Sequence, residues 1–169
     1  MTHKKQLIEK IQNRTANIGV IGLGYVGLPL VIEFLKKNFN VYGFDKENKK
    51  INKLKKNISY INYINLNLLN QKQKKKFYPT NDYSKINLID VIIICLPTPL
   101  NSKNNPDMSF IKNGLSVIEN FLRNGQLLIL ESTFRKYIYG SAWIIPIKYL
   151  WLAIAIPRTQ KNMRWLLIL

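Results

Sequence analysis

The chain has 169 residues, of which 47% are hydrophobic, so it is long enough for one domain with a buried core. Its single cysteine, Cys95, excludes an internal disulfide. The formal net charge of +17 suggests polyanion partners such as nucleic acid, but the lysines are scattered and no basic stripe is interleaved with aromatic residues. We therefore expect solvated surface lysines and no specific nucleic-acid partner. The polar N-terminus lacks the apolar segment of a secretory signal, and with the lone thiol this favours a cytoplasmic protein.

Hydrophobic patterning predicts strands that alternate with helices over the first 133 residues. A short amphipathic helix, built on Leu7, Ile8 and Ile11, precedes the first strand. We expect five strands, at 17–21, 40–45, 77–80, 90–96 and 126–133. We expect further helices at 25–37, 46–56, 66–73 and 107–122. This alternation predicts an α/β fold, a Rossmann-like doubly wound parallel sheet with flanking helices. The sheet is incomplete, which would leave the fifth strand near an unprotected edge.

The character of the chain changes after Thr133. No Asp or Glu follows Glu131, and all three tryptophans lie beyond this point. The apolar run at 143–156 contains Pro146 and Lys148 and is shorter than the ~20 residues of a spanning helix, so we expect no membrane partner. We also expect this last part of the chain to fold apart from the domain. The predicted units are an N-terminal helix, a Rossmann domain and an atypical apolar and basic tail, at 1–16, 17–133 and 134–169.

A glycine-rich loop joins the first predicted strand to the helix after it. Its glycines are Gly22, Gly24 and Gly27, and an acid, Asp45, follows at the end of the next strand. The first glycine permits a tight turn, the second lets the backbone approach a pyrophosphate, and the third allows close helix–strand packing. The helix N-terminus favours the diphosphate, and Asp45 would accept hydrogen bonds from ribose hydroxyls. Since a carboxylate repels a 2′-phosphate, the predicted cofactor is NAD rather than NADP.

Hydroxyl side chains stand at the ends of the fourth and fifth predicted strands. Thr98 follows the fourth strand and Thr133 closes the fifth, next to Glu131. Because ligands bind beyond the carboxyl ends of parallel strands, we expect these groups at the nicotinamide crevice, with a local structural role as the alternative. We expect Cys95 to be a small buried core residue. His3 stands alone near the chain end, so no metal site is predicted.

Five segments, in this order along the chain, match a known family. They are Ile18–Leu30, Gly43–Asp45, Ile94–Leu100, Asn105–Ser109 and Leu130–Thr133. Together they resemble the nucleotide-sugar dehydrogenases of the UDP-glucose/GDP-mannose dehydrogenase family, and most of all the branch that oxidises UDP-N-acetylglucosamine or related UDP-N-acetylhexosamines. The resemblance implies oxidation of the sugar C6 alcohol to a carboxylate with two NAD and a covalent cysteine intermediate. Its NAD contacts carry over to Tyr25, Val26, Asp45, Thr98 and Thr133.

The resemblance ends after Thr133. Phe134–Tyr137 stands where the family has a Tyr-Pro-Gly-Thr-Thr-like turn, and the family's catalytic lysine and cysteine segments and its UDP-binding domain find no match. Cys95 lies in the fourth strand and not at the nucleophile's position. We interpret the change as a frameshift or truncation near residue 134. The hypothesis is the NAD-binding part of a UDP-sugar 6-dehydrogenase, with no catalytic residue of its own, that is inactive alone. A UDP-sugar would be a partner only of the full-length relative.

Other interpretations stay open at this point. The chain could be a non-catalytic NAD-binding module, or one half of a split dehydrogenase whose second half is encoded separately. A basic nucleic-acid-binding protein with a Rossmann-like core is a third alternative. Hydroxyacid and 6-phosphogluconate-type dehydrogenases share the glycine loop, but the Pro-Thr-Pro-Leu and Glu-Ser-Thr motifs argue against them. The sequence determines neither the sugar nor the oligomeric state.

Overall fold

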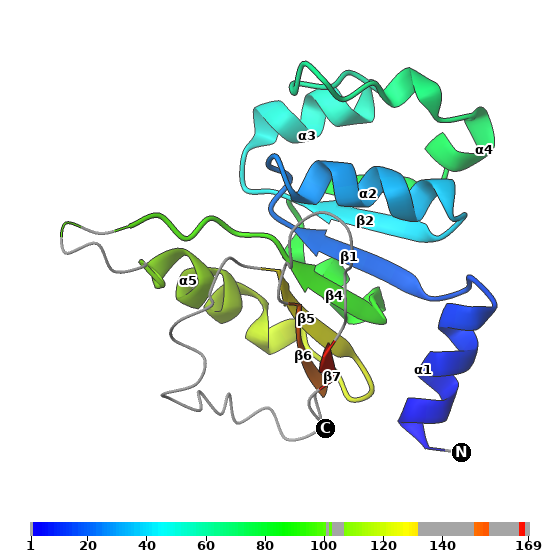
Figure 1. Cartoon of the computed structure of the whole chain (residues 1–169), viewed down its shortest axis with the longest axis vertical. Helices are drawn as coiled ribbons and strands as arrows, with labels where there is room; N and C mark the ends of the chain where they lie inside the picture. Colours follow the sequence, from blue (N-terminus) through cyan, green and yellow to red (C-terminus); the bar gives the residue numbers. More distant parts are fainter. Residues whose placement is uncertain (1, 101, 103–106, 132–150, 156–165, 168–169) are drawn as a thin grey trace.

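The computed structural model describes residues 2–100, 102, 107–131, 151–155 and 166–167, and a twisted sheet runs through its centre (Figure 1). Among these residues the sheet has seven strands in the order β3-β2-β1-β4-β5-β6-β7. The strands are β1 (Asn17–Ile21), β2 (Asn40–Phe44), β3 (Phe77–Thr80), β4 (Val91–Ile94), β5 (Leu127–Glu131), β6 (Trp151–Ala155) and β7 (Leu166–Leu167). Neighbouring strands are parallel except β6 and β7, which are antiparallel. The predicted Rossmann-like fold class is confirmed.

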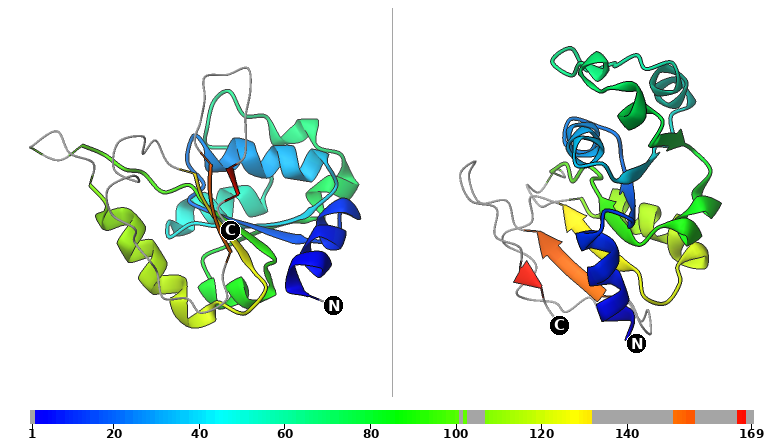
Figure 2. Two further views of the ribbon diagram at one scale, coloured as in Figure 1. Left: turned by 60° about the horizontal axis from the view of Figure 1, so that its bottom comes forward. Right: turned by 90° about the vertical axis from the view of Figure 1, so that its right-hand side faces the viewer.

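Helices cover both faces of this sheet. The α-helices are α1 (His3–Gln12), α2 (Gly27–Lys36), α3 (Asn48–Lys55), α4 (Gln71–Lys74) and α5 (Ser109–Ile118). Three 3₁₀ turns, η1 (Leu66–Leu68), η2 (Tyr83–Leu88) and η3 (Glu119–Phe121), complete the described helical elements. Figure 2 shows α2 and α5 on opposite sides of the sheet. In this arrangement the helices shield the sheet from water on either side.

Strand β4 is apolar at every position because both of its faces are buried. Val91 and Ile93 pack into the core on the α2 side, whereas Ile92 and Ile94 belong to the core beside α5 and η2. All four side chains are buried. Successive side chains of a strand point to opposite faces, so a strand covered on both faces needs apolar residues at every position.

The predicted helix at 66–73 is wrong in its continuity. The structure has η1, then an extended Leu69, then α4. The break follows from side-chain capping, because Asn70 accepts a hydrogen bond from the Gln73 N–H while the Gln73 side chain accepts one from the Asn70 N–H. This capping box starts a new helix in place of extending the first. The predicted helix at 107–122 is also shorter, since α5 ends at Ile118 and passes into η3.

Part of the tail belongs to the sheet, which corrects the expectation that this segment folds apart. Strand β6 pairs with β5 from Leu127 opposite Trp151 to Glu131 opposite Ala155. The edge of β5 is therefore paired, and the expectation of an unprotected edge is wrong for it. The physical reason is that an edge strand presents a row of unpaired N–H and C=O groups that another extended segment can satisfy. The expected change of frame near residue 134 lies outside the described residues.

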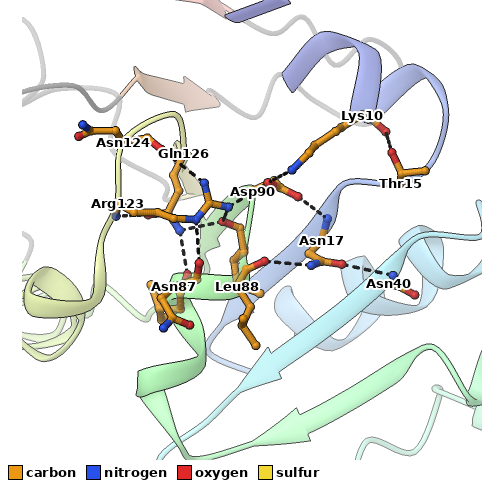
Figure 3. A network of polar contacts seen from close by, with 12 residues as sticks. Lys10, Thr15, Asn17, Asn40, Asn87, Leu88, Asp90, Arg123, Asn124 and Gln126 are labelled. Carbon is orange, nitrogen blue, oxygen red and sulfur yellow. Dashed lines mark hydrogen bonds and ion pairs between the residues drawn. The ribbon is translucent and has the colours of Figure 1, made fainter. Parts of the chain in front are cut away.

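A polar network fastens α1 to the amino-terminal ends of the strands (Figure 3). Asp90 is only 4% exposed, and its carboxylate accepts hydrogen bonds from Lys10 Nζ at 2.8 Å, the Asn17 N–H at 3.0 Å and Arg123 Nη2 at 2.9 Å. Burial alone would raise the pKa of Asp90, but these three donors outweigh it and hold the pKa below its usual value. The fully buried Gln126 side chain binds two further main-chain carbonyls at 2.8 and 2.7 Å. Asp90 thus links α1, β1 and the turn before β5 at this end of the sheet.

Candidate functional site

A cavity of about 760 Å³ opens at the carboxyl ends of the strands. Its walls come from the glycine loop, from the segment after β2, from the segment after β4 and from α5. The predicted site residues that line it are Gly22, Gly24, Tyr25, Val26, Asp45 and Thr98. Gly27 is buried beneath the loop, and Thr133 lies outside the described residues. Predicted site residues that lie up to 76 positions apart in the sequence (22 to 98) thus line one cavity.

The three glycines of the loop meet different surroundings. Gly22 has φ +90°, and a Cβ there would lie 2.6 Å from the Cys95 carbonyl oxygen. A Cβ on Gly27 would lie 1.9 Å from the Gly22 carbonyl oxygen. By contrast, no atom lies within 4 Å of the place where a Gly24 Cβ would be. Gly22 and Gly27 are therefore required by the protein's own packing, whereas Gly24 leaves open space on the cavity wall.

Three successive amides beside this space have no hydrogen-bond acceptor in the part of the chain that the structure describes. Among the described residues, the N–H groups of Gly24, Tyr25 and Val26 make no main-chain hydrogen bond, and they immediately precede the first turn of α2. Free donors at a helix N-terminus, together with the helix dipole, suit a diphosphate. The open space at Gly24 and the free donors therefore fit the phosphates of a dinucleotide.

Asp45 has a structural task that the sequence did not reveal. Its carboxylate is 6% exposed and accepts hydrogen bonds from the Leu23 N–H at 3.1 Å and the Glu47 N–H at 3.0 Å. Lys50 Nζ lies 3.6 Å from Asp45 Oδ2 and 2.5 Å from Glu47 Oε1. Burial acts to lower the pKa of Lys50, but the hydrogen bond to Glu47 and the charge of Asp45 outweigh it. The pKa of Lys50 is therefore raised above its ordinary value, and the ammonium stays charged. The carboxylate thus braces the glycine loop as well as facing the cavity.

Lys50 is a cavity residue that the sequence analysis missed. It lies in the first turn of α3, within the helix predicted at 46–56, whose lysines were expected to be solvated. In the structure Lys50 lines the cavity beside Asp45. The available signal was its place five residues after the acid, on the first turn of the following helix. That spacing brings the ammonium back toward the strand end.

The far wall of the cavity contains Thr98, Cys95 and Glu131. Cys95 packs against the core but is only half-buried and lines the cavity, which corrects the expectation of a small buried core residue. It lies just beyond the last residue of β4, where the core gives way to the cavity. Burial, reinforced by the charge of Glu131, raises the pKa of the Cys95 thiol to about 12, so the thiol is protonated at neutral pH. Burial also raises the pKa of Glu131.

The described residues contain neither a metal-binding group nor a membrane-spanning helix. In that part of the chain, no three or more His, Cys, Asp or Glu side chains are grouped so as to hold a metal ion. No helix within it has both the length and the apolar character needed to cross a membrane.

Comparison with known proteins places this geometry in a family. Residues 16–140 match the model of the UDP-glucose/GDP-mannose dehydrogenase family, NAD binding domain. The chain belongs to this family. The resemblance drawn from the sequence motifs is thereby confirmed, and NAD is the cofactor of the matched domain.

Individual relatives agree with the family assignment. The chain is 35% identical over 116 residues to UDP-N-acetyl-D-glucosamine 6-dehydrogenase of Salmonella typhi, a match that covers 69% of this chain and 27% of the relative. It is 32% identical over 118 residues to UDP-N-acetyl-D-mannosamine dehydrogenase of Pyrococcus horikoshii, a match that covers 69% of this chain and 28% of that relative. These matches span little more than a quarter of the length of the curated relatives.

Solved structures share the fold. NDP-N-acetyl-D-galactosaminuronic acid dehydrogenase from Methanosarcina mazei superposes with a TM-score of 0.74 at 26% identity, over 95% of this chain and 38% of that chain. UDP-N-acetyl-mannosamine dehydrogenase from Staphylococcus aureus gives a TM-score of 0.72 at 26% identity, over 86% of this chain and 37% of that chain. Most of the chain therefore has a structural counterpart in these dehydrogenases.

Proposed function

We propose that the chain binds NAD in the 760 Å³ cavity and is the cofactor-binding part of a dehydrogenase that oxidises C6 of a UDP-N-acetylhexosamine. The observation that carries the proposal is the open space at Gly24 beside free amides and a buried carboxylate. The amides of residues 24–26 would hold the diphosphate, and Asp45 with Lys50 would hold the adenosine ribose. The relatives that act on UDP-N-acetylglucosamine and UDP-N-acetylmannosamine support the sugar class.

The nicotinamide end of NAD belongs, in this proposal, beside Thr98 and Thr133. Thr98 supports this by lining the cavity beyond β4, whereas Asp45 follows β2, and β1 lies between these two strands. When bound, NAD supplies the acceptor for the hydride that leaves the sugar carbon. The chain's own groups bind and orient the cofactor there.

The second part of the proposal is that these 169 residues do not complete the oxidation on their own. The family resemblance implies a cysteine thiolate that captures the aldehyde. The one cysteine of this sequence is Cys95, and its pKa of about 12 leaves almost no thiolate at neutral pH. The UDP-sugar is thus a partner of longer relatives. A requirement for NAD and an unpaired thiol both favour the cytoplasm as the setting.

Titration calorimetry with NAD and NADP tests the cofactor site. We expect NAD to bind at one site and NADP to bind more weakly, because the Asp45 carboxylate repels a 2′-phosphate. Asp45→Asn should weaken NAD binding by about ten-fold or more, since hydrogen bonds to a charged group contribute about 1.5 kcal/mol or more. Glu33→Gln, an exposed carboxylate paired with Lys36 at 2.7 Å, is the matched control and should bind like wild type. Unchanged affinity in Asp45→Asn would refute the proposed site.

An absorbance assay for NADH tests the claim of inactivity. Purified chain is mixed with NAD and either UDP-N-acetylglucosamine or UDP-N-acetylmannosamine. We expect no NADH above the rate without protein. Steady NADH formation that disappears in Asp45→Asn would show that the chain carries catalytic groups of its own.

A further inference from the structure

A short segment after α3, residues 59–63, lies against the glycine loop, and we name it the tyrosine strap. The Tyr60 hydroxyl donates a hydrogen bond to the Leu23 carbonyl oxygen. The Tyr63 hydroxyl donates to the Tyr25 carbonyl oxygen at 3.4 Å, and the rings of Tyr25 and Tyr63 stack with centroids 6.3 Å apart. The strap therefore meets the loop at two main-chain carbonyls and one side chain.

The strap is itself held in place. Ser59 Oγ accepts a hydrogen bond from the Ile61 N–H at 3.1 Å and donates one to the Ile61 carbonyl at 3.0 Å. Ile61 and Ile64 are buried in the core on the α2 side. The Lys50 ammonium lies 5.8 Å from the centroid of the Tyr60 ring, within cation–π range. Tyr60 thus approaches the loop from a fixed platform.

The peptide group that Tyr60 contacts is the one that carries the Gly24 N–H. A peptide is planar, and in its trans form the carbonyl and the N–H point in opposite directions; the described residues contain no cis peptide. A hydrogen bond that holds the Leu23 carbonyl therefore directs the Gly24 N–H away from the strap. Gly24 lines the cavity, and the preceding peptide is held by Asp45 through the Leu23 N–H at 3.1 Å. Two successive peptides of the loop are pinned by side chains.

The Tyr60 hydroxyl keeps its proton. Burial, followed by the negative charges of Asp45 and Glu47, raises the pKa of Tyr60 above its ordinary value. At neutral pH the group is a phenol with an O–H to donate. A carbonyl that accepts a hydrogen bond also polarises the N–H of its own peptide, which makes that N–H a better donor.

We propose that Tyr60 is a positioning residue whose hydroxyl orients the Leu23–Gly24 peptide so that the Gly24 N–H is presented to the cofactor's diphosphate. The inference rests on the proposed function, because it needs NAD in the cavity. Tyr60 acts through the peptide and needs no contact with the cofactor. Residues far from the GxGxxG motif in sequence thereby determine how well the motif binds phosphate.

Tyr60→Phe tests this inference, because it removes the hydroxyl and keeps the ring against Lys50. We expect NAD and ADP-ribose to bind between about two-fold and ten-fold more weakly, the range that one net hydrogen bond contributes. Adenosine, which has no phosphate, should bind as it does to wild type in an NMR titration. In the free protein, the ¹⁵N–¹H resonance of Gly24 should shift. Tyr78→Phe, which removes a hydroxyl from β3 outside the cavity lining, is the matched control.

The outcomes separate the inference from the function on which it rests. If wild type binds NAD and Tyr60→Phe binds it equally well, the positioning role is refuted while the NAD site stands. If Tyr60→Phe weakens NAD, ADP-ribose and adenosine by the same factor, the hydroxyl only supports the fold and the inference is again refuted. If wild type itself fails to bind NAD, the proposed function is wrong. Selective loss for the diphosphate ligands, absent in Tyr78→Phe, supports the inference.

Discussion

Single residues of the glycine loop divide between folding and binding. Gly22 and Gly27 have no room for a methyl group because main-chain carbonyls lie 2.6 and 1.9 Å from the Cβ position. Gly24 has room on the protein side, with nothing within 4 Å. The fold itself thus requires Gly22 and Gly27, whereas the requirement for Gly24 comes, in the proposed function, from the bound diphosphate.

Alanine substitutions at Gly24 and Gly27 should separate these requirements. Gly24→Ala should keep the wild-type midpoint of urea unfolding, because its Cβ meets no atom and its φ is not positive. It should lose NAD affinity by at least about ten-fold, since the methyl group occupies the space next to the diphosphate. Gly27→Ala should lower the free energy of unfolding by about 3 kcal/mol, at the upper end for overpacking. Wild-type affinity in Gly24→Ala would contradict a diphosphate at this loop.

At the scale of elements, the two ends of the sheet have opposite tasks. The amino ends hold a polar network in which Asp90, Lys10 and Arg123 connect α1, β1, β4 and the turn before β5 (Figure 3). The carboxyl ends leave amide donors free and surround a cavity. Helix α1 carries Leu7 into the core, so its attachment contributes to the stability of the whole sheet.

Asp90→Asn should show the contribution of that network. The pKa of Asp90 is lowered in the folded chain, so its stabilisation is complete above the unfolded value near 3.8 and is lost as the pH falls through the folded pKa. At pH 7 the substitution should cost about 2 kcal/mol, since a part-exposed cluster loses its central charge. Urea unfolding from pH 7 down to below 3.8 measures both effects. The variant should lose less stability on acidification than wild type or Glu33→Gln, and a parallel loss would contradict the prediction.

At the scale of the whole molecule, a net charge of +17 coexists with a proposed cofactor site that contains one buried carboxylate, Asp45. The excess charge lies in scattered lysines, so general attraction of polyanions is expected to be weak and screened by salt. In the proposed function, specific recognition depends on the cavity, where the amides of residues 24–26 and the Asp45 carboxylate would face the cofactor.

Thermal unfolding with different ligands should distinguish these two modes. NAD at a hundred times its Kd adds about 2.7 kcal/mol to the stability of the folded chain, which should raise the Tm by roughly 5 to 10 °C. NADP at the same concentration should raise it less. Duplex DNA at physiological salt should leave the Tm unchanged, and a rise larger than that with NAD would favour a nucleic-acid partner.

Contiguous residues were enough to predict the α/β alternation, the glycine loop with Asp45 and the family, because each depends on short-range spacing or on motifs in order. The 66–73 segment was predicted as one helix, since its apolar spacing says nothing about the Asn70 capping box that divides it. The pairing of β6 with β5 was missed because strand partners far apart in sequence leave no local signal.

Tertiary packing decided the finer construction of the site. Lys50 turns into the cavity only because α3 docks beside the end of β2, and Tyr60 reaches the Leu23 carbonyl across 37 residues of chain. Cys95 is half-buried because β4 ends where the cavity begins. Periodicity records which face of an element is apolar, whereas a hydrogen bond between distant segments exists only after those segments have packed. The motif therefore predicts the class of ligand, whereas the tertiary structure determines how the groups proposed to bind that ligand are oriented.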